Sequence, residues 1–170
     1  MERVMIVAAS AGSGKSTLAK QVGAAKGLNV YHLDSFYFRR GWVEVPQGEF
    51  IERIQKAVMQ EKWVIDGNYS STFRYREARA DTVLYIELPL RVCLYRIVKR
   101  YITYHGKTRN DVGCTEKLDA AFLKFVITTY RRRKKDMRER CSRWHRQGKN
   151  VIVLNSRQKV RKFEDLNHKI

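Results

Sequence analysis

Residues 9–17, Ala-Ser-Ala-Gly-Ser-Gly-Lys-Ser-Thr, combine the residue types that bind phosphate. They directly follow the apolar run Val4–Ala8, so a buried strand is expected to lead into a glycine-rich turn and then a helix from about Ser16. Backbone N–H groups of such a turn can surround the β- and γ-phosphates of a nucleotide, and the helix N-terminus adds the positive end of its dipole. The residues that we predict to bind nucleotide are Ala11, Gly12, Ser13, Gly14, Lys15, Ser16 and Thr17.

Each residue type in this phosphate-binding loop has an expected role. Lys15 would reach the terminal phosphates, and the Ser16 hydroxyl would ligate Mg²⁺. Gly12 and Gly14 are expected because a side chain there would block the close approach of backbone to phosphate. The pattern G-x-x-x-x-G-K-[ST] has glycine where this chain has Ala9, and alanine adopts a positive φ less readily. We therefore expect a slightly altered entrance to the loop.

Two aspartates each follow a predicted strand, where carboxylates can serve phosphoryl transfer. Asp66 ends the apolar run that begins at Trp63 and is placed to hold Mg²⁺ directly or through water, although Asp-Gly is also ordinary turn chemistry. Asp34 could accept a substrate hydroxyl proton, bind a water on Mg²⁺, or cap the following segment. His32 alternates with apolar residues and is expected to be a core histidine. Parallel strands place their carboxyl ends at one edge, so both aspartates should lie near the loop.

Several arginines could stabilise the charge of a transferring phosphoryl group. Arg96 and Arg100 are four residues apart and share one helix face, while Lys107 and Arg109 lie in the polar segment that follows. The alternative for these four is a solvated basic surface. Three further arginines could contact a phosphate or an acid on the acceptor: Arg74, Arg76 and Arg79.

The stretch 131–146 holds nine basic residues against Asp136 and Glu139. In a kinase of small molecules, its first arginines could point at phosphates while the others face water. In a nucleic-acid-binding protein, the whole stretch would follow a phosphate backbone. From these residues we expect at most weak nucleic-acid binding.

Composition restricts the class of protein. The chain has 170 residues, 35 Lys+Arg and 17 Asp+Glu, and its formal net charge of +18 favours polyanionic partners. Its three cysteines, Cys93, Cys114 and Cys141, form no C-x-x-C pair and are expected to be reduced thiols. An apolar run begins at Val4, and no such run approaches 18 residues, so we expect neither a signal peptide nor a membrane span. These features predict a single domain over 1–170 in a cytoplasmic monomer.

The order of the predicted elements indicates an α/β fold. Helices alternate with strands, which favours a parallel sheet with right-handed crossovers. The expected strands are 4–8, 29–33, 63–65, 81–88 and 151–154. The expected helices begin near 16 and cover about 47–61, 91–104 and 115–147, with a short helix after 157. In helix 91–104, the residues expected to face inward are Val92, Tyr95, Val98 and Ile102.

The chain resembles the DNA topology modulation proteins (FlaR-like), a family of adenylate-kinase-like P-loop proteins, over nearly its whole length. The resemblance rests on residues 10–17, His32-Leu33-Asp34, Gly41-Trp42, residues 63–69, residues 79–83 and Gly106-Lys107-Thr108-Arg109. It implies a three-layer P-loop NTPase fold with a sheet in the order 2-3-1-4-5. It also implies ATP with Mg²⁺ as cofactors, and a short arginine-bearing lid at about 101–114. The nucleotide base would pack between lid-helix residues and the turn at Asn155–Arg157, which makes Asn155 a cofactor-binding candidate.

These observations predict an ATP-binding, Mg²⁺-dependent phosphotransferase or ATPase of the nucleotide-kinase type. Its partners would be ATP and a phosphate acceptor that the sequence does not identify. The candidate catalytic residues are Lys15, Asp34, Arg96, Arg100 and Arg109, and the candidate metal ligands are Ser16 and Asp66. The alternative is a basic, nucleotide-regulated DNA-binding protein that modulates DNA topology or gene expression. A nucleotide-sensing module without turnover is a third hypothesis.

Overall fold

The computed structural model describes residues 1–104, 115 and 118–168. The strands are β1 (Arg3–Ala8), β2 (Asn29–His32), β3 (Phe38–Arg39), β4 (Val43–Glu44), β5 (Trp63–Asp66), β6 (Thr82–Ile86) and β7 (Asn150–Leu154). The helices are α1 (Lys15–Lys26), α2 (Leu33–Tyr37), α3 (Gln47–Val58), α4 (Phe73–Arg79), α5 (Leu90–Tyr104), α6 (Ala120–Arg146) and α7 (Arg157–His168), with a 3₁₀ turn at Ser70–Thr72. Of the expected lid, only 101–104 are described, as the last turn of α5, so Lys107 and Arg109 lie outside the described residues.

Five parallel strands form the central sheet, in the order β2-β5-β1-β6-β7. Met5 at its centre lies opposite Ile65 on β5 and Val83 on β6. The labels depart from the expected 2-3-1-4-5 because the chain forms two short strands that we did not predict. These strands, β3 and β4, pair with each other as an antiparallel hairpin outside the sheet. When the two hairpin strands are left out of the numbering, the order of the strands in the sheet is 2-3-1-4-5.

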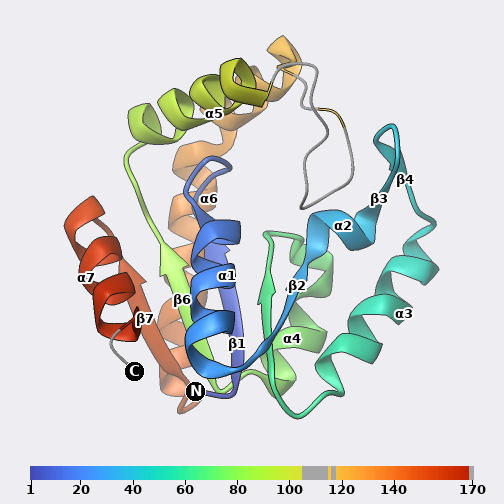
Figure 1. Cartoon of the computed structure of the whole chain (residues 1–170), viewed down its shortest axis with the longest axis vertical. Coiled ribbons are helices and arrows are strands. Elements are labelled where there is room, and N and C mark those ends of the chain that lie inside the picture. The colour runs from blue at the N-terminus through green and yellow to red at the C-terminus, as the bar shows by residue number, and fades with distance from the viewer. Residues whose placement is uncertain (105–114, 116–117, 169–170) are drawn as a thin grey trace.

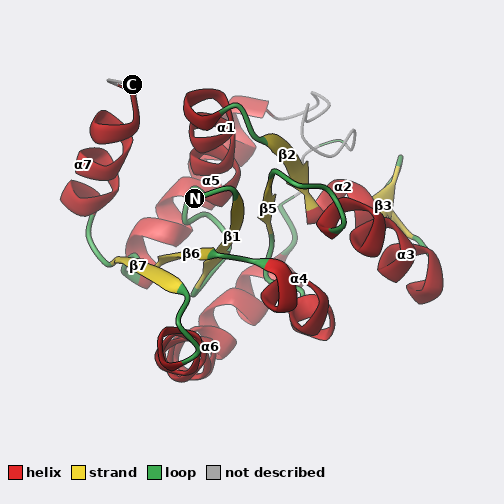
Figure 2. Ribbon diagram, turned by 90° about the horizontal axis from the view of Figure 1, so that it is seen from below, coloured by secondary structure: helices red, strands yellow, loops and turns green. Residues whose placement is uncertain are grey.

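Both faces of the sheet are covered by helices, as the alternation of elements predicted (Figure 2). Along β1, Val4 and Ile6 belong to the apolar cluster that includes α1 and α7, while Met5 and Val7 belong to the cluster that includes α3, α4 and α6. Strand side chains alternate between faces, so a strand buried on both sides is apolar throughout. The sequence pattern of β1 follows from this position.

Helix α5 does not pack in the way that its sequence suggested. It crosses above the carboxyl ends of the strands and does not lie along a face of the sheet (Figure 1). Tyr95, Val98 and Ile102 are therefore exposed, by 60%, 38% and 71%, and their predicted inward orientation was wrong. Cys93 and Ile97 are buried instead. No helix of the described residues is long and apolar enough to cross a membrane.

Helix α6 is continuous and begins at Ala120, five residues later than expected. The Asp119 side chain caps its first turn by accepting a hydrogen bond from the Ala121 amide. Glu87, which follows β6, is nearly buried and ties α6 to the sheet. Its carboxylate accepts two hydrogen bonds of 2.6 Å from Arg138 and lies 3.2 Å from Lys134. Two members of the basic stretch are thus held in internal ion pairs.

Replacing Glu87 with glutamine should destabilise the fold at neutral pH. Burial alone would raise the pKa of Glu87, but hydrogen bonds from Arg138, Lys134 and Tyr85 outweigh burial and lower it. Because Arg138 is 60% exposed, solvent screens part of the interaction, and we expect a loss of about 1–2 kcal/mol in urea denaturation. Because folding lowers the pKa of Glu87, the ionised side chain stabilises the folded state at pH values above the ordinary pKa of glutamate. The difference in unfolding free energy between the unmodified protein and Glu87→Gln should therefore shrink as the pH falls through and below that pKa.

The matched control is Glu52→Gln, which removes an exposed i,i+4 pair with Lys56 and should change stability by less than about 0.5 kcal/mol. An equal and pH-independent effect of both substitutions would contradict the role assigned to Glu87.

Candidate active site

A large cleft of about 1310 Å³ opens at the carboxyl ends of the strands. Its walls come from the phosphate-binding loop, α1, α5, α6, α7, the α2–hairpin region and the turn after β5. The predicted site residues that line it are Ala11, Gly12, Ser13, Gly14, Lys15, Ser16, Thr17, Asp34, Asp66, Arg96 and Arg100. The structure therefore brings together residues that are up to 89 positions apart, from 11 to 100.

The loop has the backbone geometry of an anion site. Gly14 has φ +98° and precedes α1, and no side chain caps the N-terminus of this helix. The first N–H groups of a helix have no partner within it, so here they are directed toward the cleft and available to an anion. Ala9 is buried, its amide donates to the Ile86 carbonyl, and its φ is not positive. Alanine therefore causes no strain where the consensus has glycine.

Gly12 is required for a reason that the sequence did not reveal. Its φ is +70°, and a Cβ there would clash with the carbonyl oxygen of Cys93 and lie 2.9 Å from Cγ1 of Ile97. The close approach that excludes a side chain is thus with α5. At Gly14, by contrast, a Cβ would lie 3.2 Å from an Arg96 guanidinium nitrogen, inside the cleft.

Lys15 lies at the N-terminus of α1, with its ammonium 3.5 Å from the Ser10 carbonyl. Burial lowers the pKa of Lys15, while the charges of Asp66 and Asp34 raise it and that of Arg133 lowers it further. The two aspartates and Arg133 therefore have opposite effects on the pKa of this ammonium. An anion bound in the loop would add a favourable charge beside it.

Asp66 is buried and its two carboxylate oxygens are both hydrogen bonded. The Ser16 hydroxyl donates to Oδ2 at 2.8 Å, and His32 Nδ1 lies 2.7 Å from Oδ1. This places the two predicted metal ligands in contact with each other. His32, expected to be a core histidine, is half-buried and has Asp66 as its hydrogen-bond partner.

The donor set fits Mg²⁺ held jointly with a nucleotide. Among the described residues there is no group of three or more His, Cys, Asp or Glu that could hold a metal by itself. Mg²⁺ prefers oxygen ligands and often takes only one or two from the protein, the rest coming from phosphates and water. The Ser16 hydroxyl and the Asp66 carboxylate are oxygens of this kind, beside a loop suited to phosphate.

Asp34 lies in the first turn of α2 and lines the cleft. The Tyr69 hydroxyl donates to Asp34 Oδ1 at 2.8 Å. Burial, and then the charge and hydrogen bond of Asp34, raise the pKa of Tyr69, so the phenol remains a donor. Within the described part of the chain, Asp34 Oδ2 accepts no hydrogen bond and is available to a ligand.

Three arginines line the cleft from α5 and α6. Arg96 donates to the Ser13 carbonyl at 3.0 Å, and Arg100 lines the cleft one turn further along α5. Arg133 of α6 also lines the cleft, with its guanidinium stacked 5.1 Å above the Phe125 ring. We expected only that the first arginines of the basic stretch could reach phosphate, and the sequence did not distinguish Arg133 from its neighbours.

Four residues with predicted contacts do not line the cleft, namely Arg74, Arg76, Arg79 and Asn155. Asn155 is exposed and does not line the cleft, which is lined at this end by Arg157, Val160 and Arg161. Arg76 is buried and donates to the carbonyls of Gly67 and Tyr69, so it is a structural residue and not an acceptor ligand. Burial lowers the pKa of Arg76, and its three acceptor groups and the Phe73 ring offset that cost.

Solved structures share this fold. A sugar kinase from Janibacter sp. HTCC2649 matches with a TM-score of 0.52 and 14% identity over 99% of this chain and 91% of its own. A Chloroflexus aurantiacus protein, provisionally called a kinase, matches with a TM-score of 0.55 and 11% identity over 99% and 98%. An uncharacterised protein from Eubacterium ventriosum matches with a TM-score of 0.53 and 16% identity over 98% and 96%.

These similarities show that the chain has the fold of those proteins. No family model matches the sequence. Nor does any curated protein match it. The chemistry of the cleft therefore has to be inferred from its own residues.

Asp66→Asn should weaken nucleotide binding selectively when Mg²⁺ is present. The amide keeps an oxygen for Ser16 but removes the charge that a divalent ion requires, so the gain in affinity from Mg²⁺ should fall by tenfold or more. Isothermal titration with an ATP analogue, with Mg²⁺ and with EDTA, measures this gain. Asp81→Asn is the control, because Asp81 accepts amide hydrogen bonds at the opposite edge of the sheet. Equal losses with and without metal would indicate a purely structural Asp66.

Proposed function

We propose that this protein is an ATP-using, Mg²⁺-dependent phosphotransferase that acts on a hydroxyl group of a small acceptor. One observation carries the proposal: a single cleft contains a phosphate-binding loop with Lys15, the Ser16–Asp66 pair, and Asp34 with one carboxylate oxygen available. The kinase names of two structures with the same fold agree with it. Lys15, Ser16 and Asp66 are expected to act on the nucleotide, and Asp34 on the acceptor.

At the nucleotide end, the chain binds and neutralises phosphate. The N–H groups at the start of α1 and the Lys15 ammonium would contact the β- and γ-phosphates. Arg96, Arg100 and Arg133 would offset the charge on the transferring group. Ser16 and Asp66 would hold Mg²⁺, which supplies further charge neutralisation when bound.

At the acceptor end, Asp34 is placed to take a proton. As the acceptor oxygen forms its bond to the γ-phosphorus, its proton passes to Asp34 Oδ2, and the bond between the γ-phosphorus and the bridging oxygen breaks. ADP leaves with that electron pair. Tyr69 holds the other oxygen of Asp34 and so fixes the orientation of the carboxylate. With water as acceptor the same steps describe an ATPase.

The basic stretch offers a nucleic acid less charge than the sequence implies. Lys134 and Arg138 pair with Glu87, Arg143 lies 3.5 Å from Glu77, and Arg140 stacks on Phe73. The members left exposed outside these contacts include Arg131, Arg132 and Lys135. We expect binding to duplex DNA of about 10⁻⁴–10⁻⁶ M at physiological salt, as for an ordinary cationic surface.

A phosphotransfer assay tests the proposed function. The protein is incubated with γ-labelled ATP, Mg²⁺ and a panel of alcohols, nucleosides and nucleotides, and labelled products are separated from phosphate. Lys15→Ala should abolish most nucleotide binding and turnover while the protein still unfolds cooperatively. Asp34→Asn should retain ATP affinity and lower transfer by 10²-fold or more, because a positioned general base contributes about 10²–10⁴.

Lys26→Ala, at the other end of α1, is the control and should behave as the unmodified protein. If Lys15→Ala bound and turned over ATP normally, the loop would not be the nucleotide site. If Asp34→Asn transferred phosphate at the full rate, Asp34 would not be the base.

A further inference from the structure

The two ends of the cleft differ in charge. Its basic lining residues all come from α1, α5, α6 and α7, around the phosphate-binding loop. They are Lys15, Lys20, Arg96, Lys99, Arg100, Arg133, Arg157 and Arg161. The opposite end is lined from 34–42 and 66–69, and no lysine or arginine of these two segments lines the cleft. Asp34 and Asp66 are the charged lining residues of these segments, and the cleft has two further acidic lining residues, Asp119 before α6 and Glu164 on α7.

The arginines nearest to this acceptor end are engaged elsewhere. Arg39 lies 2.7 Å from Glu49, and Arg53 binds both Glu49 and the Phe36 carbonyl. Arg76 is buried beneath the turn that carries Tyr69. Arg40 is exposed and does not line the cleft. Among the described residues, the acceptor end therefore has no cation placed to receive a phosphate monoester.

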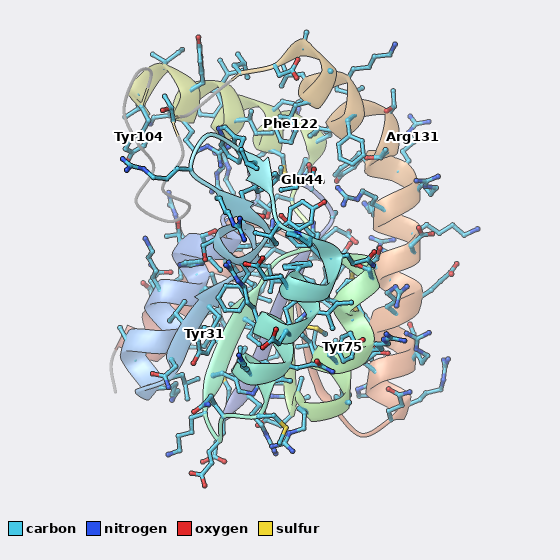
Figure 3. The ribbon with its side chains drawn as sticks, turned by 90° about the vertical axis from the view of Figure 1, so that its right-hand side faces the viewer. Tyr31, Glu44, Tyr75, Tyr104, Phe122 and Arg131 are labelled. Atoms are coloured by element: carbon cyan, nitrogen blue, oxygen red, sulfur yellow. The ribbon has the colours of Figure 1, made fainter. Side chains whose placement is uncertain are left out.

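Aromatic rings take the place of cations there. Phe38 and Trp42 line the cleft from the hairpin, with their ring centroids 5.1 Å apart. Two further rings, Phe122 of α6 and Tyr104 of α5, line the same cleft and are labelled in the upper part of Figure 3. These rings offer flat apolar surface to a ligand.

Trp42 is held in place by a strained backbone. Its φ is +65°, and it is the one non-glycine residue of the described chain with a positive φ. Its indole N–H donates a hydrogen bond of 2.8 Å to the carbonyl of Thr115, a residue that precedes α6. Strain of this kind costs about 1–3 kcal/mol and persists where the surrounding structure enforces it, often at ligand sites. A ring fixed in this way is suited to stacking.

We propose that the acceptor is an uncharged alcohol with a flat ring, and that a phosphorylated form of the same compound is excluded. This inference rests on the proposed phosphotransferase function. A hydroxyl can donate to Asp34 while its ring lies against Phe38 and Trp42. A monoester dianion would instead meet the Asp34 carboxylate, and because no lysine or arginine of the described segments 34–42 and 66–69 lines the cleft, that repulsion rejects it.

The test compares compounds that differ only by a phosphate. Adenosine, cytidine and thymidine are paired with their 5′-monophosphates, pyridoxine adds a ring alcohol that is not a nucleoside, and glycerol supplies hydroxyls without a ring. Binding is titrated in the presence of ADP and Mg²⁺, and transfer is measured with labelled ATP. At least one ring alcohol should bind and be phosphorylated, with kcat/KM at least 10²-fold above that of its monophosphate or of glycerol.

Preference for a monophosphate, preference for glycerol, or no binding of any ring alcohol would overturn the inference. Failure of the proposed function is recognised separately, because ATP would then not bind in a Lys15-dependent way. A monophosphate acceptor with intact, Lys15-dependent ATP binding would contradict only the acceptor class.

Two variants test the rings. Phe38→Leu keeps the Trp42–Thr115 hydrogen bond, and Trp42→Gly suits the positive φ, so neither should unfold the protein. Each should raise the KM for the ring alcohol about tenfold, because stacking a base on an aromatic ring contributes about 1–3 kcal/mol, and leave the KM for ATP unchanged. Ile127→Ala, which truncates an exposed apolar side chain of α6 that does not line the cleft, is the control. Unchanged acceptor KM in both variants would show that the rings do not contact the acceptor.

Discussion

An ionised carboxylate can be buried only where hydrogen bonds replace water, and Asp66 meets this condition with side chains from two other elements. His32 from β2 and Ser16 from α1 each engage one of its oxygens. Because β2 and β5 are adjacent in the sheet, this contact fixes the carboxyl edge of the sheet against the start of α1. The phosphate-binding loop, the metal ligands and the turn to Tyr69 are positioned relative to one another by it.

Two further contacts determine what surrounds that edge. Gly12 lets α5 approach the loop closely enough for Arg96 to reach the Ser13 carbonyl. Glu87 binds Arg138 and thereby fixes α6, which brings Arg133 to the same cleft. The cations gather at one end as a result, and Asp34 with the hairpin rings remains at the other. The separation of charge along the cleft follows from how these helices are attached to the sheet.

The loop, the strands and the placing of Asp34 and Asp66 could be predicted from the sequence because each depends on short-range pattern. Buried parallel strands are apolar throughout, and G-S-G-K-S-T has few other uses. The orientation of α5 could not be predicted, since its partner is the loop and its apolar stripe faces solvent. The Gly12 and Glu87 contacts were missed because they join distant segments, and the burial of Arg76 was missed because arginine is seldom fully buried. The short hairpin and α4 have too few residues to show periodicity, and Arg109 and the lid lie outside the described residues.

The central claim is that one cleft holds a nucleotide on the loop and leaves Asp34 free for an acceptor. A crystal structure with Mg²⁺ and a non-hydrolysable ATP analogue tests it most directly. We expect the β- and γ-phosphates against the amides of residues 12–17, the metal beside the Ser16 hydroxyl and Asp66, and the γ-phosphate facing Asp34. A nucleotide bound elsewhere on the basic surface, or phosphates turned away from Asp34, would contradict the account.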